Sequence, residues 1–177
     1  YVTMYVAKTL LRLNSMIGER SETESLLRSS LAYLDKSVAN SIAEMKKYTK
    51  KNDVPYIGTL CEDYLYCLTL LPSSPMICLS QVAKNNRDYL IKYLAENTRR
   101  DDMATKANSA IVLADNDKKK DALEFMESIR QHTVYREDMG RYFDSYRAIN
   151  TWCDYRIPTQ VAAIEAFKKV RAEIEGK

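Results

Sequence analysis

The stretch Cys78-Leu79-Ser80-Gln81 carries a residue pair whose spacing could do covalent chemistry. A cysteine thiol and a glutamine side chain three residues later can close an internal thioester, and that bond would capture nucleophiles. Serine at a cap and proline at the first helical position favour a helix that starts at Ser73-Ser74-Pro75. Since residues at i and i+3 share one face of a helix, this predicted helix would allow the bond.

Ordinary packing is the competing interpretation of the same residues, and it is the one that we favour. In it Ile77, Cys78 and Val82 make core contacts and Gln81 is solvated. The other cysteine-led stretch, Cys61-Glu62-Asp63-Tyr64, contains no glutamine and cannot form such a bond.

The other metal-binding and catalytic residue types do not form a recognisable set. His132 is the only histidine and no Cys-x-x-Cys pair occurs, so a zinc site is not predicted. Asp101 and Asp102 are adjacent carboxylates, but a magnesium site needs more converging oxygen ligands, and acidic residues also suit a helix start. We predict no catalytic residue, no metal and no cofactor, and therefore no enzyme. For the four cysteines two states remain open, disulfide bonds and buried free thiols, and we favour free thiols. The four are Cys61, Cys67, Cys78 and Cys153.

Composition favours a helical protein. The 177 residues include four glycines and four prolines, and 46% are apolar. Sheets and turn-rich folds usually need more glycine and proline, so helices joined by short turns are predicted. A net charge of +3 is too small to indicate nucleic-acid binding, and no apolar run is long enough to span a bilayer. The chain opens without methionine inside an amphipathic pattern, so we expect a piece of a longer protein.

Apolar spacing predicts three antiparallel helix pairs, a long loop and one further helix. The first helix is expected to end at Gly18 and to bury Val6, Leu10, Leu13 and Ile17. The last helix is expected to start at Pro158 and to bury Val161, Ile164, Phe167, Val170 and Ile174. The predicted fold class is all-α, with the helix pairs in a curved αα-toroid or superhelix-like array that forms one domain over 1–177.

Residues 131–157 break the helical pattern and are rich in aromatic side chains. We predict an ordered loop here, with or without a short β-hairpin. Its aromatic residues form either a surface that contacts another domain or partner, or a local core over the helix ends, and both remain open. The candidate surface residues are Tyr135, Tyr142, Phe143, Tyr146, Trp152 and Tyr155.

The segment TWCDYRIPTQVAAIEAF at 151–167 resembles a region of bacterial alpha-2-macroglobulin-like proteins, especially the large ones of the Bacteroidetes type. That family region reads W-Y … I-E-T-Q-A-x-x-I-E-A-F. Earlier stretches resemble the family in the same order: 2–13 is similar to a helix after its Gly- and Trp-rich stretch, and LAYLD at 31–35 to A-x-x-Y-L-D. YLY at 64–66 is similar to H-Y-L-Y-A-R, and 137–143 to E-L-G-M-Y-W. The resemblance covers nearly the whole chain.

This resemblance implies that the chain is the later part of an αα-toroid domain in a protease trap. In such a protein a protease cuts an exposed bait segment, and a rearrangement of the molecule entangles the protease. Family members are lipoproteins or periplasmic proteins of the cell envelope, so that localisation is implied. The family's thioester motif, Cys-x-Glu-Gln, lies upstream of the matched region. Because Ser80 stands in place of its glutamate, no thioester is expected at Cys78.

We therefore expect a structural and interaction role. The expected partners are other domains of the parent protein and a target protease, with no nucleic acid and no membrane insertion. The first or last helix is also predicted to pair with another copy through an exposed apolar edge. The alternatives are a stand-alone helical-repeat interaction module and, less favoured, a toroidal enzyme.

Overall fold

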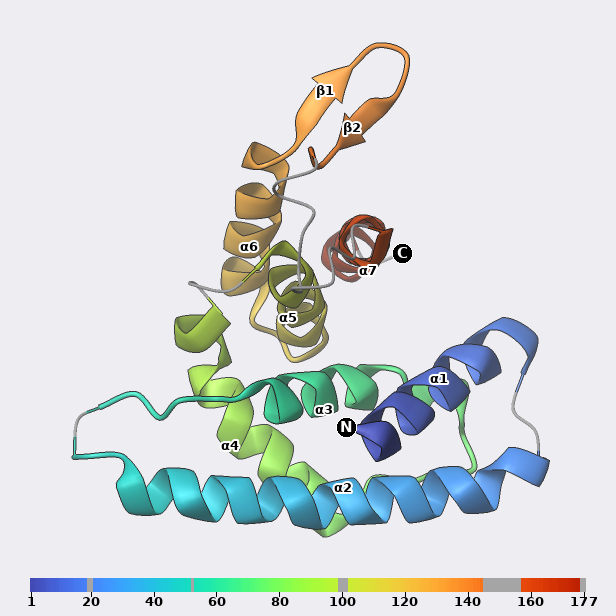
Figure 1. The fold of residues 1–177 in the computed structure, drawn as a ribbon, viewed down its shortest axis with the longest axis vertical. Coiled ribbons are helices and arrows are strands. Elements are labelled where there is room, and N and C mark those ends of the chain that lie inside the picture. The colour runs from blue at the N-terminus through green and yellow to red at the C-terminus, as the bar shows by residue number, and fades with distance from the viewer. Residues whose placement is uncertain (19–20, 52, 99–101, 145–156, 176–177) are drawn as a thin grey trace. The chain divides into compact units, whose positions relative to one another are not determined.

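The computed structural model describes residues 1–18, 21–51, 53–98, 102–144 and 157–175. Helices make up most of these residues, and a single short antiparallel hairpin accompanies them in the described ranges, so the predicted all-α fold class is confirmed (Figure 1). In chain order the elements are α1 (Val2–Ile17), α2 (Ser21–Tyr48), α3 (Thr59–Thr69), the 3-10 helix η1 (Leu71–Ser73), α4 (Gln81–Thr98), α5 (Met103–Asp115), α6 (Lys119–Gln131), β1 (Val134–Arg136), β2 (Gly140–Tyr142) and α7 (Ile157–Glu175).

The chain divides into two compact units, residues 1–94 and 95–177. The first unit holds α1, α2, α3, η1 and most of α4, and the second holds α5, α6, the hairpin and α7. The predicted single domain over 1–177 stays a prediction. The toroidal arrangement of the helices stays a prediction.

In the first unit, α2 and α3 run antiparallel and α1 packs against both (Figure 1). The apolar face of α2 is buried, from Leu27 through Val38 to Ile42. Tyr64 and Tyr66 of α3 are the largest fully buried side chains of this unit. Since burying one large apolar side chain contributes about 1.5–3 kcal/mol, these faces supply the unit's core stability.

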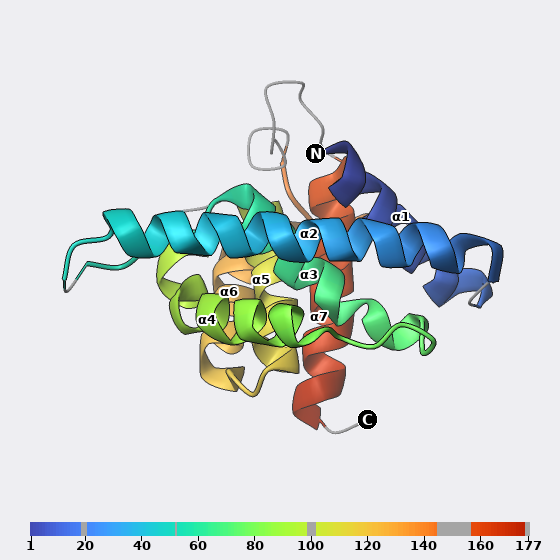
Figure 2. The ribbon, with the colours of Figure 1, turned by 90° about the horizontal axis from the view of Figure 1, so that it is seen from below.

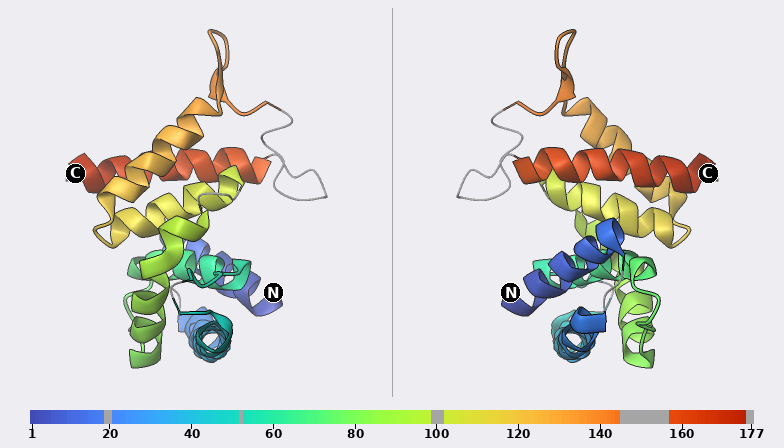
Figure 3. Two further views of the ribbon diagram at one scale, coloured as in Figure 1. Left: turned by 90° about the vertical axis from the view of Figure 1, so that its left-hand side faces the viewer. Right: turned by 90° about the vertical axis from the view of Figure 1, so that its right-hand side faces the viewer.

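In the second unit, α5 packs on both α6 and α7, as Figure 3 shows. Asp102 caps α5 as predicted: its carboxylate accepts hydrogen bonds from the backbone N–H groups of Ala104 at 2.8 Å and Thr105 at 3.0 Å. A two-stranded hairpin of β1 and β2 follows α6, so the segment after residue 131 does contain a short β-hairpin. Its tight turn ends at Gly140, whose φ of 74° lies in the left-handed region that favours glycine.

The predictions of the buried faces of α1 and α7 are largely wrong. In α1 the buried residues are Met4, Ala7, Leu11 and Asn14, whereas Leu13 and Ile17 are exposed. In α7 the unit buries a different row, namely Thr159, Ala162, Ala163, Ala166 and Val170, of which only Val170 was predicted. Small side chains let two helix backbones approach closely, so α7 packs through its alanines rather than its largest aliphatic residues. In α1 the packed face still includes the large side chains of Met4 and Leu11.

The start predicted for α4 is also wrong, because that helix begins at Gln81 and not near Pro75. Ser74 and Pro75 form a turn instead, closed by a 2.9 Å hydrogen bond from the Ile77 N–H to the Ser74 carbonyl. Proline is favoured at the second position of such a turn. The Ser74 hydroxyl is buried and accepts a 2.7 Å hydrogen bond from the Asn14 side-chain amide of α1, so it does not cap a helix. Residues 77–80 then connect this turn to α4 without regular secondary structure (Figure 2).

Candidate functional site: a pocket beside a buried aspartate

Asp35 of α2 is a buried carboxylate that joins three segments of the first unit. One of its oxygens accepts a 2.7 Å hydrogen bond from the Tyr64 hydroxyl of α3, and the other accepts a 2.6 Å bond from the Ser80 hydroxyl. Its backbone carbonyl accepts a 2.9 Å bond from the Asn86 amide of α4. A charged group at 8% exposure is costly unless it is hydrogen-bonded, and these contacts satisfy both carboxylate oxygens.

Ser80 connects this carboxylate to the start of α4. Its hydroxyl donates to Asp35 and accepts from the Ala83 N–H at 2.9 Å, and its carbonyl accepts from the Lys84 N–H. These bonds are those of a helix N-cap, and Asp35 orients the capping hydroxyl. The helix therefore begins after Ser80, because the Asp35 carboxylate directs the Ser80 hydroxyl toward the helix end.

The pKa of the Tyr64 hydroxyl is raised well above its usual value. Burial is the main cause, because it disfavours the phenolate, and the hydrogen bond to the Asp35 carboxylate adds to it. Tyr64 therefore stays a neutral donor to Asp35 throughout the ordinary pH range. This arrangement positions side chains, and nothing in it activates a nucleophile.

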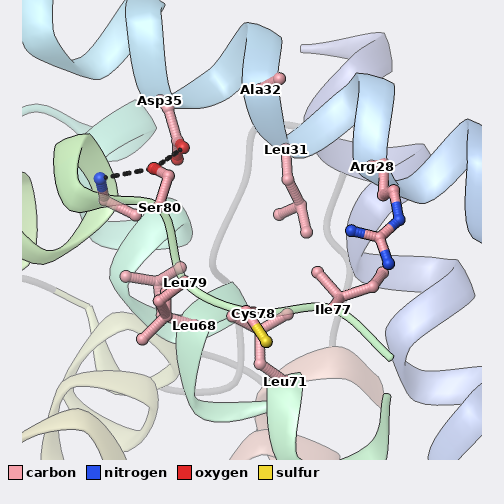
Figure 4. Close-up of a pocket in the computed structure, with 11 residues that line it drawn as sticks. Arg28, Leu31, Ala32, Asp35, Leu68, Leu71, Ile77, Cys78, Leu79 and Ser80 are labelled. Atoms are coloured by element: carbon pink, nitrogen blue, oxygen red, sulfur yellow. Dashed lines mark hydrogen bonds between the residues drawn. The ribbon is translucent and has the colours of Figure 1, made fainter. Parts of the chain in front are cut away.

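A pocket of about 170 Å³ opens between α2 and the stretch before α4 (Figure 4). Its walls are mostly aliphatic, with Arg28 at one end and the hydrogen-bonded pair of Asp35 and Ser80 at the other (Figure 4). The aliphatic lining comes from α2, α3, η1 and the stretch itself, and includes Leu31, Leu68, Leu71, Ile77 and Leu79. Its volume matches that of a dry engineered cavity that holds one benzene, about 150 Å³, so one aliphatic or small aromatic group would fit.

Cys78 lies at this pocket as an exposed free thiol (Figure 4). It precedes α4, whereas Gln81 is the first residue of that helix, so the two do not share a helix face. The Gln81 side-chain amide donates to the Asn85 side chain at 3.0 Å instead. The packing that we favoured for this stretch is correct for the buried Ile77 and the exposed Gln81, and wrong for Cys78 and Val82, which are exposed.

Two other cysteines are buried thiols, as predicted. Burial raises the pKa of Cys61 to about 11, with a smaller effect of the Glu62 charge. Burial likewise raises the pKa of Cys67 to about 12. Because the thiolate is the reactive form, both thiols are chemically quiet in the fold. Cys153 lies outside the described residues.

The aromatic candidates separate into surface and core. Tyr135 is 65% exposed and its ring lies under the Arg141 guanidinium, whereas Tyr142 is half-buried. Phe143 is 3% exposed and belongs to the core, so it does not contribute to a surface. The side-chain amide of Gln160 on α7 holds its backbone, accepting from the Phe143 N–H at 3.2 Å and donating to its carbonyl at 3.0 Å. The other candidates, Tyr146, Trp152 and Tyr155, lie outside the described residues.

His132 does not belong to any cluster of catalytic side chains in the described part of the chain. Its ring nitrogen lies 2.6 Å from the Ser128 carbonyl at the end of α6. Across the described ranges, no three His, Cys, Asp or Glu side chains gather in a way that could hold a metal ion. No helix among the described residues is long and apolar enough to cross a membrane.

Two apolar stripes lie on the surface of the units, on the first and last helices, and include Leu13, Val161 and Ile164, which were predicted to be buried. On α1 the stripe consists of Val2, Tyr5, Leu13 and Met16, with Met16 81% exposed. On α7 it consists of Ile157, Val161 and Ile164, flanked by Phe167, and Ile164 is 69% exposed. Each helix thus has two apolar faces, one packed in its own unit and one open. Contiguous exposed apolar patches on a protein surface mark interaction sites.

Sequence reasoning missed Asp35, although a signal for it exists. The residue sits within the buried face of α2, four positions after Leu31 and three before Val38. A carboxylate on an otherwise apolar helix face predicts a buried hydrogen-bond network.

Comparison of the chain with protein-family models, with curated proteins and with solved structures found no match.

Proposed function

We propose that this chain is a helical-toroid part of a bacterial alpha-macroglobulin-like protease inhibitor, with a structural and contact role rather than a catalytic one. The observation that carries the proposal is the pair of open aliphatic stripes on α1 and α7. A helix that is apolar on two opposite faces suits a position inside a larger helical array, where it contacts a neighbour on each side.

The resemblance of residues 151–167 and of the earlier stretches supports the same assignment, as does the all-α fold. Under this proposal, the partners of the two stripes are helices of the parent protein, and the parent resides in the cell envelope. The chain contributes no thioester, because Cys78 and Gln81 do not lie on one helix face and Gln81 bonds to Asn85.

The test is a trapping assay on a longer polypeptide that contains this chain. A protease that is entangled keeps an intact active site but cannot reach large substrates. We expect the polypeptide to suppress cleavage of a protein substrate while cleavage of a short peptide substrate continues. Equal loss of both activities would indicate an active-site inhibitor, and loss of neither would mean that there is no trap.

A matched pair of variants tests the role of α7 in the same assay. Ile164→Asp places a carboxylate in the open stripe, whereas Lys120→Asp places one at an exposed position of α6, outside the stripe. We expect the first variant to lose trapping and the second to keep it. Equal behaviour of the two variants would argue against a contact through the stripe.

A further inference from the structure

The stretch Ile77–Ser80 presents a free backbone edge beside the pocket. Within the residues that the structure describes, the backbone groups of Cys78 and Leu79 make no hydrogen bond. Figure 4 shows the stretch running along one side of the pocket, opposite Leu31 and Arg28 of α2. An unpaired extended backbone is a template onto which another extended segment can add, with main-chain hydrogen bonds between them.

The pocket supplies what such an added segment needs for specificity. In strand addition, main-chain bonds give affinity and a pocket for every second side chain gives selectivity. The pocket volume of about 170 Å³ suits one side chain of leucine, methionine or phenylalanine size. Its aliphatic walls exclude a charged group at that position, because Asp35 already has hydrogen-bond partners on both carboxylate oxygens.

The rim carries an excess of positive charge. Arg28 is paired with Glu24 at 2.7 Å, so this pair is nearly neutral. Lys36 lies one helical turn after the pocket-lining Ala32, and Lys84 follows the pocket-lining Ala83 directly, so two exposed lysines adjoin the lining residues. Acidic residues on either side of the inserted side chain would therefore complement the rim.

We propose that this pocket and the backbone of Ile77–Ser80 together bind an extended segment of another protein, with one leucine-sized apolar side chain in the pocket and acidic residues flanking it. The occupant pairs with the free N–H and carbonyl groups of Cys78 and Leu79. The proposal does not depend on the trap function, since it rests on the geometry of the first unit alone.

The test measures binding of a fluorescent acetyl-Asp-Val-Leu-Val-Asp-amide peptide to the full chain by anisotropy. Alanine in place of the central leucine leaves the pocket largely unfilled, so it should weaken binding about tenfold or more. Lysine in place of both aspartates should also weaken binding, and N-methylation of the peptide backbone should abolish it. Peptides that bind equally well with and without the leucine would overturn the proposal.

Matched variants place the site on the chain. Ala32 is an exposed residue of α2 that lines the pocket, so Ala32→Phe would fill it without disturbing the core. Ala43→Phe makes the same change at another exposed position of α2, about 16 Å away along the axis at 1.5 Å per residue. We expect the first variant to weaken binding about tenfold or more and the second to change it less than about twofold.

Cys78 provides an independent readout in a Cys153→Ser chain. Because Cys61 and Cys67 are buried, iodoacetamide should modify Cys78 first, and saturating peptide should slow that reaction in the parent chain but not in Ala32→Phe. Unchanged alkylation at saturating peptide would overturn the proposed site. Slower alkylation at higher protein concentration without peptide would also overturn it, in favour of a second copy of this chain as the occupant.

Discussion

Replacing Asp35 tests whether its hydrogen bonds hold the first unit together. In Asp35→Ala, the Tyr64 hydroxyl keeps its place at 0% exposure but loses its acceptor. A buried donor without a partner costs about 1–3 kcal/mol. The Ser80 cap loses the group that orients it, which adds about 1 kcal/mol. We therefore expect Asp35→Ala to lower the free energy of unfolding of this unit by about 3 kcal/mol.

The assay is the urea dependence of amide hydrogen exchange in α3, because it reports on the unit that contains Asp35. Tyr64→Phe serves as the partner variant, since it removes the buried hydroxyl and keeps the ring. In the double variant the buried Tyr64 hydroxyl is absent, so it is not left without an acceptor. We therefore expect the double variant to lose about 1 kcal/mol less free energy of unfolding than the two single variants added together. Additive costs, or a loss below about 1 kcal/mol for Asp35→Ala, would refute this reasoning.

Three further predictions follow from the described contacts. Gln160→Leu should speed hydrogen exchange of the Phe143 amide and lower the free energy of unfolding by about 1–2 kcal/mol. Unchanged exchange would mean that the two hydrogen bonds between Gln160 and Phe143 contribute little to stability. Raised pKa values of about 11 for Cys61 and about 12 for Cys67 mean that the unfolded chain releases these thiol protons near pH 9 while the folded chain retains them. The free energy of unfolding should thus fall above pH 9, by about 1.4 kcal/mol per pH unit per thiol, and urea midpoints at pH 8 and 10.5 should fall less in a variant with both cysteines replaced by alanine. If the open stripes attract a second copy, sedimentation should show self-association that Ile164→Asp reduces, and a strict monomer at high concentration would contradict it.

Helix positions were predictable from this sequence because local signals mark them. Gly18 ends α1 with a φ of 84°, Asp102 caps α5, and the apolar face of α2 matches its buried face. These signals act within a few residues and need no knowledge of the partner element. Capping residues together with apolar periodicity therefore located the end of α1 and the start of α5.

The packed faces of α1 and α7 were not predictable in the same way. Periodicity selects the row of largest aliphatic residues, such as Val161 and Ile164, whereas the unit packs through Ala162 and Ala166. Which of two apolar faces a helix buries depends on its partner, and the sequence of one helix does not contain that information.

The start of α4 and the pocket beside it could not be predicted from local sequence either. Ser80 caps α4 because Asp35, 45 residues earlier in the chain, directs its hydroxyl. Ser74 was the stronger local candidate, but Asn14 uses its hydroxyl in a buried contact. Both contacts join residues far apart in sequence, so the start of α4 and the extended stretch beside the pocket follow from the tertiary structure.

The central claim is that the open stripes of α1 and α7 are contact surfaces within a larger helical protein. Carbene footprinting read by mass spectrometry tests this most directly, on the 177-residue chain and on a longer polypeptide that contains it. We predict that the stripe residues Leu13, Met16 and Ile164 are labelled in the isolated chain and protected in the longer polypeptide. Exposed Tyr33 of α2, which lies on neither stripe, should be labelled in both. Equal labelling of the stripes in the two samples would contradict the claim.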